Sequence, residues 1–214
     1  MVLIFSLVFN LFFYQKIQRL EEKEQILVKD VFDGDTFYME NQLKVRLLNV
    51  DAPDLEYCAG KDSKKRLEEL ILGKKVRIDW VTTDKFGRAV ALVYQGKNFI
   101  NLIMVEEGWG NYEGRKIAES EELVAATRKA KEEGLGIFSP ACYQRDNPDK
   151  PECTIKGNNS RDTGEKIYHF PGCSSYSTII VEKFMGDEWF CSEKEAREAG
   201  FKRSENCYDK KYTP

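Results

Sequence analysis

The sequence predicts an α+β fold that is mainly β: a small, mostly antiparallel barrel or sandwich with three helices. Two features of the sequence lead to this prediction. Five short segments rich in Val, Ile, Leu and aromatic residues are separated by turn signals, and three other stretches carry apolar residues at helical spacing. A hydrophobic content of 42% and a charged content of 32% are typical of a globular chain.

The predicted strands are bounded by residues that favour turns, among them Asp33-Gly34, Gly73 and Gly96. Between these turns the chain is rich in β-branched and aromatic side chains, which fit a pleated, half-buried surface. We expect the five strands at Ile26–Phe32, Thr36–Glu40, Lys44–Val50, Lys75–Val81 and Ala89–Tyr94.

Helical spacing of apolar residues predicts helices at Ser63–Leu72, Ile100–Glu107 and Glu119–Glu133. The last of these is strongly charged, and its apolar residues lie along one side. Gly134 and Gly136 follow it directly and are typical of a helix end.

The N-terminal segment Met1–Tyr14 is almost entirely apolar, although a bilayer span needs about 20 such residues. We interpret residues 1–24 as a hydrophobic helix that anchors the chain in a membrane, followed by a charged stalk. A cleaved signal peptide and a core helix are the alternatives. Lys16 and Arg19 would place the body in the cytoplasm by the positive-inside rule. The cysteines favour the outside, so we expect a membrane-anchored or secreted, extracytoplasmic protein.

The net charge of −3 argues against a protein that coats nucleic acid without sequence preference. Such proteins need a basic excess, because neutralising phosphates dominates their affinity. Any basic surface must therefore be local. Nothing in the sequence indicates an obligate protein partner.

Two pairs of aspartates stand at the ends of neighbouring predicted strands. Asp33 and Asp35 flank a glycine, and Asp51 and Asp54 follow the third strand, where Pro53 stops it. Clustered carboxylates are hard oxygen ligands that suit Ca²⁺ or Mg²⁺ better than Zn²⁺.

Two arginines accompany these carboxylates. Arg46 lies within the intervening strand and Arg88 follows a Phe-Gly turn. A guanidinium matches phosphate oxygens with two parallel donors, so arginines converging on an acidic cluster indicate a phosphate between them.

Four sequence blocks resemble, in order and spacing, those of the staphylococcal nuclease (thermonuclease) family. They are DGDT at 33–36, VRLLNVDAPD at 45–54, TDKFGR at 83–88 and the closing segment LGIFSP at 135–140. The resemblance covers residues 25–140 and implies an OB-fold, a five-stranded barrel with three helices. OB-folds bind oligonucleotides on one barrel face.

The resemblance also implies a calcium site. Asp35 and Asp51 would ligate Ca²⁺, the carbonyl of Ala52 would add a backbone ligand, and Asp33 would lie just outside these ligands. The implied reaction is calcium-dependent hydrolysis of DNA or RNA phosphodiester bonds by water, leaving 3′-phosphate ends.

Further roles follow from the same resemblance. Arg46 and Arg88 would stabilise charge on the phosphorus under attack, and Lys85 would bind phosphate. Asp54 stands where the family has a glutamate that orients or deprotonates water, so we expect a slower enzyme. Phe86 stands where the family often has tyrosine. These two departures favour the alternative, a non-catalytic nucleic-acid- or protein-binding OB-fold module.

Six cysteines, an even number, predict three disulfides in an extracytoplasmic chain. A bridge between Cys58 and Cys142 would staple the end of the barrel to the segment after its acidic cluster. The alternative for the others is a structural zinc site with candidate ligands Cys153, His169, Cys173, Cys191 and Cys207.

Residues 141–152 are predicted to form a linker, and residues 153–214 a small α+β module bearing cysteines. This module resembles one appended to bacterial thermonuclease-like proteins, and also zinc-binding modules of some DNA-associated proteins. Tyr168, Trp189 and Phe190 are either a stacking platform for bases or its core, and in so small a unit we favour the core.

Overall fold

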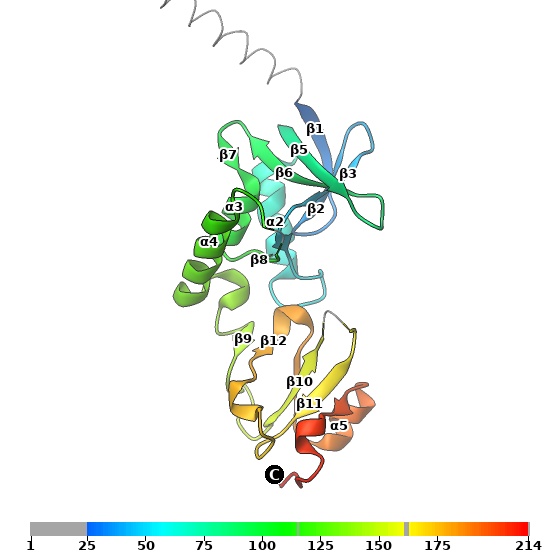
Figure 1. The fold of residues 1–214 in the computed structure, drawn as a ribbon, viewed down its shortest axis with the longest axis vertical. Helices are drawn as coiled ribbons and strands as arrows, with labels where there is room; N and C mark the ends of the chain where they lie inside the picture. Colours follow the sequence, from blue (N-terminus) through cyan, green and yellow to red (C-terminus); the bar gives the residue numbers. More distant parts are fainter. Residues whose placement is uncertain (1–24, 115, 161–162, 214) are drawn as a thin grey trace, which may run out of the picture.

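The computed structural model describes residues 25–114, 116–160 and 163–213. A β-barrel with its helices lies at one end of the elongated molecule, and a smaller sheet with its own helix lies at the other (Figure 1). We call residues 25–140 the barrel region and residues 153–213 the C-terminal region. The predicted membrane segment 1–24 lies outside the described residues. Within the described ranges, no helix is long and apolar enough to cross a bilayer.

Five strands close into a barrel, which confirms the predicted fold class. β1 pairs antiparallel with β2 and β5, β2 with β3, and β5 with β6, while a parallel pairing of β3 with β6 closes the ring. β7 extends the sheet beyond β6. The strands are β1 (Ile26–Val31), β2 (Thr36–Met39), β3 (Lys44–Leu47), β5 (Lys75–Thr83), β6 (Ala89–Gln95) and β7 (Asn98–Phe99).

The third predicted strand, Lys44–Val50, is two strands in the structure. β3 ends at Leu47, and Asn49 adopts a left-handed conformation with φ of 59°. Asparagine tolerates this conformation better than most residues. β4 (Val50–Asp51) then leaves the barrel and pairs with β8 (Asn111–Tyr112). The break turns the chain so that Asp51 faces β3 instead of continuing it.

Three helices cover the barrel and confirm the predicted ones: α2 (Gly60–Ile71), α3 (Ile100–Glu106) and α4 (Ser120–Glu133). Each buries one face against the barrel, including Leu67 on α2 and Met104 on α3. α2 begins at Gly60, earlier than the predicted Ser63. The prediction missed this first turn because the turn carries no apolar residue at helical spacing. A Cβ at Gly60 would lie 2.0 Å from the carbonyl oxygen of Asp54, so only glycine fits there.

The C-terminal region is built on a second sheet with strand order β13-β10-β11-β14. Aromatic side chains fill its core, with Tyr168, Phe170, Phe190 and Phe201 all buried. The core interpretation of Tyr168 and Phe190 is therefore confirmed over a stacking platform. The elements are β10 (Ile155–Asn159), β11 (Lys166–His169), β12 (Val181–Glu182), β13 (Glu188–Phe190), β14 (Lys202–Arg203), α5 (Glu193–Glu198) and the short 3₁₀ turns η2 (Tyr176–Thr178), η3 (Lys183–Met185) and η4 (Glu205–Cys207).

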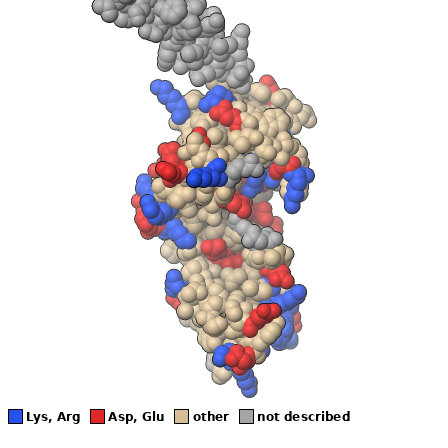
Figure 2. All heavy atoms as spheres, in the orientation of Figure 1, with Lys and Arg blue, Asp and Glu red and all other residues tan. Residues whose placement is uncertain are grey.

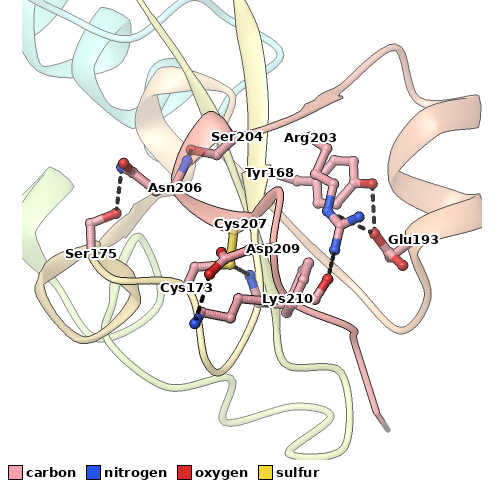
Figure 3. The surroundings of a disulfide bond; sticks show 11 residues. Tyr168, Cys173, Ser175, Glu193, Arg203, Ser204, Asn206, Cys207, Asp209 and Lys210 are labelled. Atoms are coloured by element: carbon pink, nitrogen blue, oxygen red, sulfur yellow. Dashed lines mark hydrogen bonds and ion pairs between the residues drawn. A yellow bond between two sulfur atoms is a disulfide. The ribbon is translucent and has the colours of Figure 1, made fainter.

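All six cysteines form disulfides, which confirms the predicted state. The pairs are Cys58–Cys142, Cys153–Cys191 and Cys173–Cys207. The alternative of a zinc site is wrong, because each cysteine it required is bonded to another sulfur. Figure 3 shows the Cys173–Cys207 bridge beside ion pairs and hydrogen bonds that tie β11 and β14 to α5, including the Tyr168 hydroxyl on Glu193 at 2.8 Å.

A seam of contacts joins the two regions. β9 (Tyr143–Gln144), within the predicted linker, pairs with β12, and the 3₁₀ turn η1 (Gly136–Phe138) packs nearby. The backbone N–H of Lys183 donates to the Cys142 carbonyl at 2.8 Å, beside the Cys58–Cys142 bridge. Phe138 and Phe184 share one buried cluster there. The segment around Cys58, which follows the acidic cluster, is thus attached to Cys142 after the barrel and to Lys183 of the C-terminal region.

Candidate active site

Arg46 joins two carboxylates that come from different elements. Its Nη1 lies 2.6 Å from Oδ1 of Asp35, and its Nη2 lies 2.7 Å from Oδ1 of Asp51. Arg46 is on β3, Asp35 is in the loop between β1 and β2, and Asp51 is on β4. Because the guanidinium has donors in a fixed fork, it holds the two carboxylates at a set separation. The structure thus brings together three predicted site residues.

The loop that carries Asp35 is fixed by close packing. The backbone N–H of Asp35 donates to Oδ1 of Asp33 at 3.0 Å, which closes a tight turn. A Cβ at Gly34 would lie 1.9 Å from Oγ of Ser63 on α2, so the loop can approach the helix only with glycine there. Asp33 therefore shapes the loop, and its side chain lies on the backbone of that loop.

The Asp35 carboxylate is almost fully buried, at 2% exposure. It accepts hydrogen bonds from the Thr36 hydroxyl at 2.7 Å and from the Ala52 backbone N–H at 3.0 Å. Burial raises the pKa of Asp35 to about 7, although the guanidinium of Arg46 opposes the rise. A buried carboxylate in this state is stabilised by nearby positive charge.

The oxygen atoms of Asp35 and its neighbours are of the kind that calcium prefers as ligands. Arg46 bonds Oδ1 of Asp35 and Oδ1 of Asp51 through different nitrogens, and the Ala52 backbone N–H donates to Oδ2 of Asp35. Calcium accepts carboxylates, backbone carbonyls and water as ligands. No group of three or more His, Cys, Asp or Glu side chains gathers for a metal within the described residues. The residues fit Ca²⁺ if carbonyl and water oxygens complete its shell.

Arg88 is linked to the same carboxylate through a threonine. Its Nε lies 2.6 Å from Oδ2 of Asp84, and its Nη1 donates to Oγ1 of Thr36 at 3.4 Å. Since the Thr36 hydroxyl donates onward to Asp35, one network connects Arg88 with Arg46. Thr36 lay inside the DGDT block but was not among the predicted site residues.

The two arginines open onto one cleft of about 500 Å³. Lys85 and Phe86 are at its wall, and the Phe86 ring is 71% exposed. The Lys85 ammonium lies 5.1 Å from the centroid of that ring and the Arg88 guanidinium carbon 5.3 Å from it. The residues lining the cleft are Arg46, Leu47, Leu48, Asn49, Val50, Asp84, Lys85, Phe86, Arg88, Val90 and Glu113.

Glu113 is a cleft residue that sequence reasoning missed. It follows β8, and its backbone N–H donates to the Asn49 carbonyl at 3.2 Å. Only the pairing of β8 with β4 brings it to the cleft, and no local pattern signals that pairing.

Asp54 lies outside the network around Arg46. Its side chain is exposed, and its backbone carbonyl accepts the N–H of Tyr57 at 3.0 Å in the turn that leads to Cys58. Asp54 is thus close to the acidic cluster in sequence. Within the described structure, however, its carboxylate is not bonded to the side chains of that cluster.

Charge on the visible face of the molecule is mixed. Figure 2 shows Lys and Arg interspersed with Asp and Glu over both regions, with no extended basic surface on that face. The positive groups of the cleft are a local feature, as the net charge of −3 led us to expect.

Comparison with known proteins gives matches to nucleases. The family described as staphylococcal nuclease homologues matches residues 44–140. An uncharacterized endonuclease of Haemophilus influenzae is 32% identical over 122 residues, covering 55% of this chain and 68% of that protein. A micrococcal nuclease of Shigella flexneri is 27% identical over 124 residues, covering 51% of this chain and 70% of that protein.

A probable staphylococcal-like nuclease of Oryza sativa subsp. japonica is 29% identical over 118 residues. That match covers 55% of this chain but only 30% of the rice protein, so this chain spans a minor part of its length.

Proposed function

This chain belongs to the staphylococcal nuclease family, and from that premise we propose that it is a calcium-dependent nuclease that cleaves DNA or RNA and leaves 3′-phosphate ends. As a member of the family it is a hydrolase of phosphodiester bonds. The observation that carries the proposal is the network in which Arg46 and Arg88 reach the buried Asp35 and open onto one cleft.

Asp35, Asp51 and the Ala52 carbonyl would hold the calcium ion, which when bound supplies a Lewis acid for a phosphoryl oxygen. Asp33 would hold the loop in shape through its hydrogen bond to the Asp35 backbone. The burial of Asp35 supports this assignment, because a buried carboxylate needs nearby positive charge to stay ionised.

Arg46 and Arg88 would bind the scissile phosphate and stabilise the negative charge that builds on it. Both are held in advance, Arg46 by two carboxylates and Arg88 by Asp84. Donors fixed before reaction need no reorganisation, and removing one typically costs about 3–4 kcal/mol of transition-state stabilisation. Lys85 and Phe86 would contact a neighbouring phosphate and base.

Asp54 is the proposed base that orients or deprotonates the attacking water. Its exposed side chain leaves it free of the Arg46 network. It is one methylene shorter than the family's glutamate, and a displacement of about 1 Å in a catalytic group can lower the rate about 100-fold. We therefore expect Asp54→Glu to raise kcat.

The three disulfides support an extracytoplasmic location, since such bonds persist in oxidising compartments. We propose that residues 1–24 hold the protein at a membrane. We also propose the division into a nuclease domain at 25–140, a connection at 141–152 and an appended module at 153–214.

Cleavage of labelled single-stranded DNA and RNA by the full-length chain, with Ca²⁺ or with a chelator, tests the proposal. Arg46→Lys and Arg88→Lys keep the charge beside the buried carboxylate but lose the fork, so kcat should fall about 10²- to 10³-fold. Arg66→Lys is the matched control, because Arg66 is ion-paired with Glu107 and is not among the residues lining the cleft. Phosphatase treatment of the products would reveal 3′-phosphate ends.

A non-catalytic nucleic-acid- or protein-binding module is the second candidate, favoured by the exposed Asp54 outside the network. A folded wild-type chain and Asp54→Glu variant that both bind oligonucleotide without calcium-stimulated cleavage would establish this second function and overturn the first.

A further inference from the structure

A row of side chains on the outer face of β2 and β3 lies next to Arg46. Val45 and Leu47 of β3 point into the core, so Lys44 and Arg46 share the outer face of the strand. In the pairing with β2, Lys44 is opposite Tyr38 and Arg46 is opposite Thr36. Lys44 and Tyr38 therefore form the row next to the one that holds Arg46, outside the cleft described above.

Phe32, the residue just after β1, lies beside this row. Its ring is 51% exposed, and its backbone N–H donates to the Thr36 carbonyl at 2.8 Å. The Lys44 ammonium lies 4.2 Å from the centroid of the Phe32 ring and 5.3 Å from that of Tyr38. One cation is thus placed between two aromatic rings on an open surface.

The arrangement repeats a feature of the cleft that Arg46 and Arg88 line. There, the exposed Phe86 ring lies beside the cations of Lys85 and Arg88. An exposed phenylalanine with a basic partner therefore occurs twice on this surface: Phe32 beside Lys44, and Phe86 beside Arg88 at the start of β6. Aromatic rings stack on nucleic-acid bases, and adjacent basic groups track the backbone.

The spacing along β3 suits a polynucleotide. Lys44 and Arg46 are two residues apart on one strand, which places them about 6.6 Å apart along it. That is comparable with the length of one extended nucleotide. A phosphate held by Arg46 would therefore have its neighbour within reach of Lys44.

We propose that Phe32, Tyr38 and Lys44 form a subsite for the nucleotide next to the cleaved phosphate. The base stacks on the Phe32 ring while Lys44 turns to the phosphate. A base inside a duplex has no free face to offer, so the subsite selects unpaired strands. The inference rests on the proposed nuclease function, because it is the polynucleotide that joins the two sites.

The test compares Phe32→Ala, Lys44→Gln and wild type in the full-length chain, on a single-stranded oligonucleotide and its duplex. Loss of one stacked base should raise KM for the single strand about 5- to 150-fold with kcat little changed. KM for the duplex should not move. Affinity falls as salt rises, so the slope of log affinity against log salt is negative. Lys44→Gln should make this slope shallower by about 0.7, the value for one phosphate on a single strand.

Two matched controls separate the subsite from general surface effects. Tyr208→Ala removes an aromatic side chain that is 66% exposed in the C-terminal region. Lys97→Gln removes an exposed lysine at the far end of β6 from Arg88. Both should leave KM and the salt slope unchanged. Phe32 is exposed, so unchanged melting temperatures would show that the variant folds.

An abasic scan identifies the bound nucleotide. Removing the base that stacks on Phe32 should cost as much as Phe32→Ala, and the two changes together should cost no more than either alone. Two outcomes would overturn the subsite: an additive loss at every position, or unchanged KM in both Phe32→Ala and Lys44→Gln. Lys44 would then only pack against the exposed Phe32 ring.

Binding measured by fluorescence anisotropy in chelator keeps this inference separate from the proposed function. If Phe32→Ala binds more weakly and wild type does not cleave, the subsite is supported and the proposed nuclease function is rejected. Cleavage by wild type with equal binding by both proteins would do the reverse.

Discussion

The barrel region and the C-terminal region are stabilised in different ways. A continuous apolar core runs through the barrel, from Phe37 on β2 to Leu123 on α4, and no disulfide joins two barrel strands. The C-terminal region has a much smaller core and two disulfides of its own, Cys153–Cys191 and Cys173–Cys207. A short chain buries too little apolar surface to be stable alone, and cross-links compensate by restricting the unfolded chain.

The two regions also bury charge differently. In the barrel, Asp35 is paired with Arg46 and lies beside the cleft. In the C-terminal region, the Lys156 ammonium donates to the Ile179 carbonyl at 2.8 Å and lies 4.4 Å from the Tyr176 ring centroid. The first arrangement leaves an arginine lining the cleft. The second satisfies the charge internally and points to a structural role.

The largest effect should follow from removing both disulfides of the C-terminal region by serine substitution of their four cysteines. Each cross-link contributes about 4 kcal/mol in the chain-entropy account. We expect this region to unfold while the barrel keeps its own transition, as followed by calorimetry and limited proteolysis. Loss of both transitions together would show that the barrel depends on the C-terminal region.

A cavity in the barrel core should have the opposite pattern. Leu67 on α2 is fully buried, so Leu67→Ala should destabilise the barrel by about 2–5 kcal/mol. The transition of the C-terminal region should keep its midpoint. Leu72→Ala, at an exposed leucine just beyond the same helix, is the control and should change little.

The seam offers a smaller effect on catalysis. Replacing Cys58 and Cys142 together by serine releases the segment that follows Asp51 and Asp54, so kcat should fall about tenfold, because small displacements of catalytic groups are costly. Removing the Cys153–Cys191 bridge instead should spare kcat. If both variants were equally active, the seam would have no role in positioning this segment.

The smallest effect concerns pH. Burial lowers the pKa of His169 below its ordinary value of 6.5, and the nearby Lys156 adds to this. Its Nδ1 is buried and has no hydrogen-bond partner among the described residues. The folded state therefore binds a proton less readily than the unfolded state. Stability should be complete above about pH 6.5 and decline as the pH falls below it. The melting temperature of the C-terminal region should lose part of this dependence in His169→Leu, and an unchanged slope would contradict the prediction.

Much of the barrel was predictable from local pattern. The apolar and aromatic runs of β1, β2 and β6 are bounded by turn residues, and α2 to α4 carry apolar residues at helical spacing. Both signals depend only on neighbours in sequence. The blocks that carry Asp35, Asp51, Arg46 and Arg88 were readable for the same reason. The state of the cysteines followed from their even number.

Contacts between distant segments could not be read in this way. The four cysteines of the C-terminal region allow three pairings, and only the folded chain selects Cys153–Cys191 and Cys173–Cys207. The break at Asn49, which separates β3 from β4, depends on the pairing of β4 with β8.

The sequence by itself thus determined the fold class, the chemistry of the carboxylates and arginines, and the oxidation of the cysteines. The tertiary structure alone decided that Thr36 bridges Asp35 and Arg88 and that Lys44 lies between Phe32 and Tyr38. The physical reason is that residue types fix what a group can bind, whereas closure of the barrel fixes which groups meet.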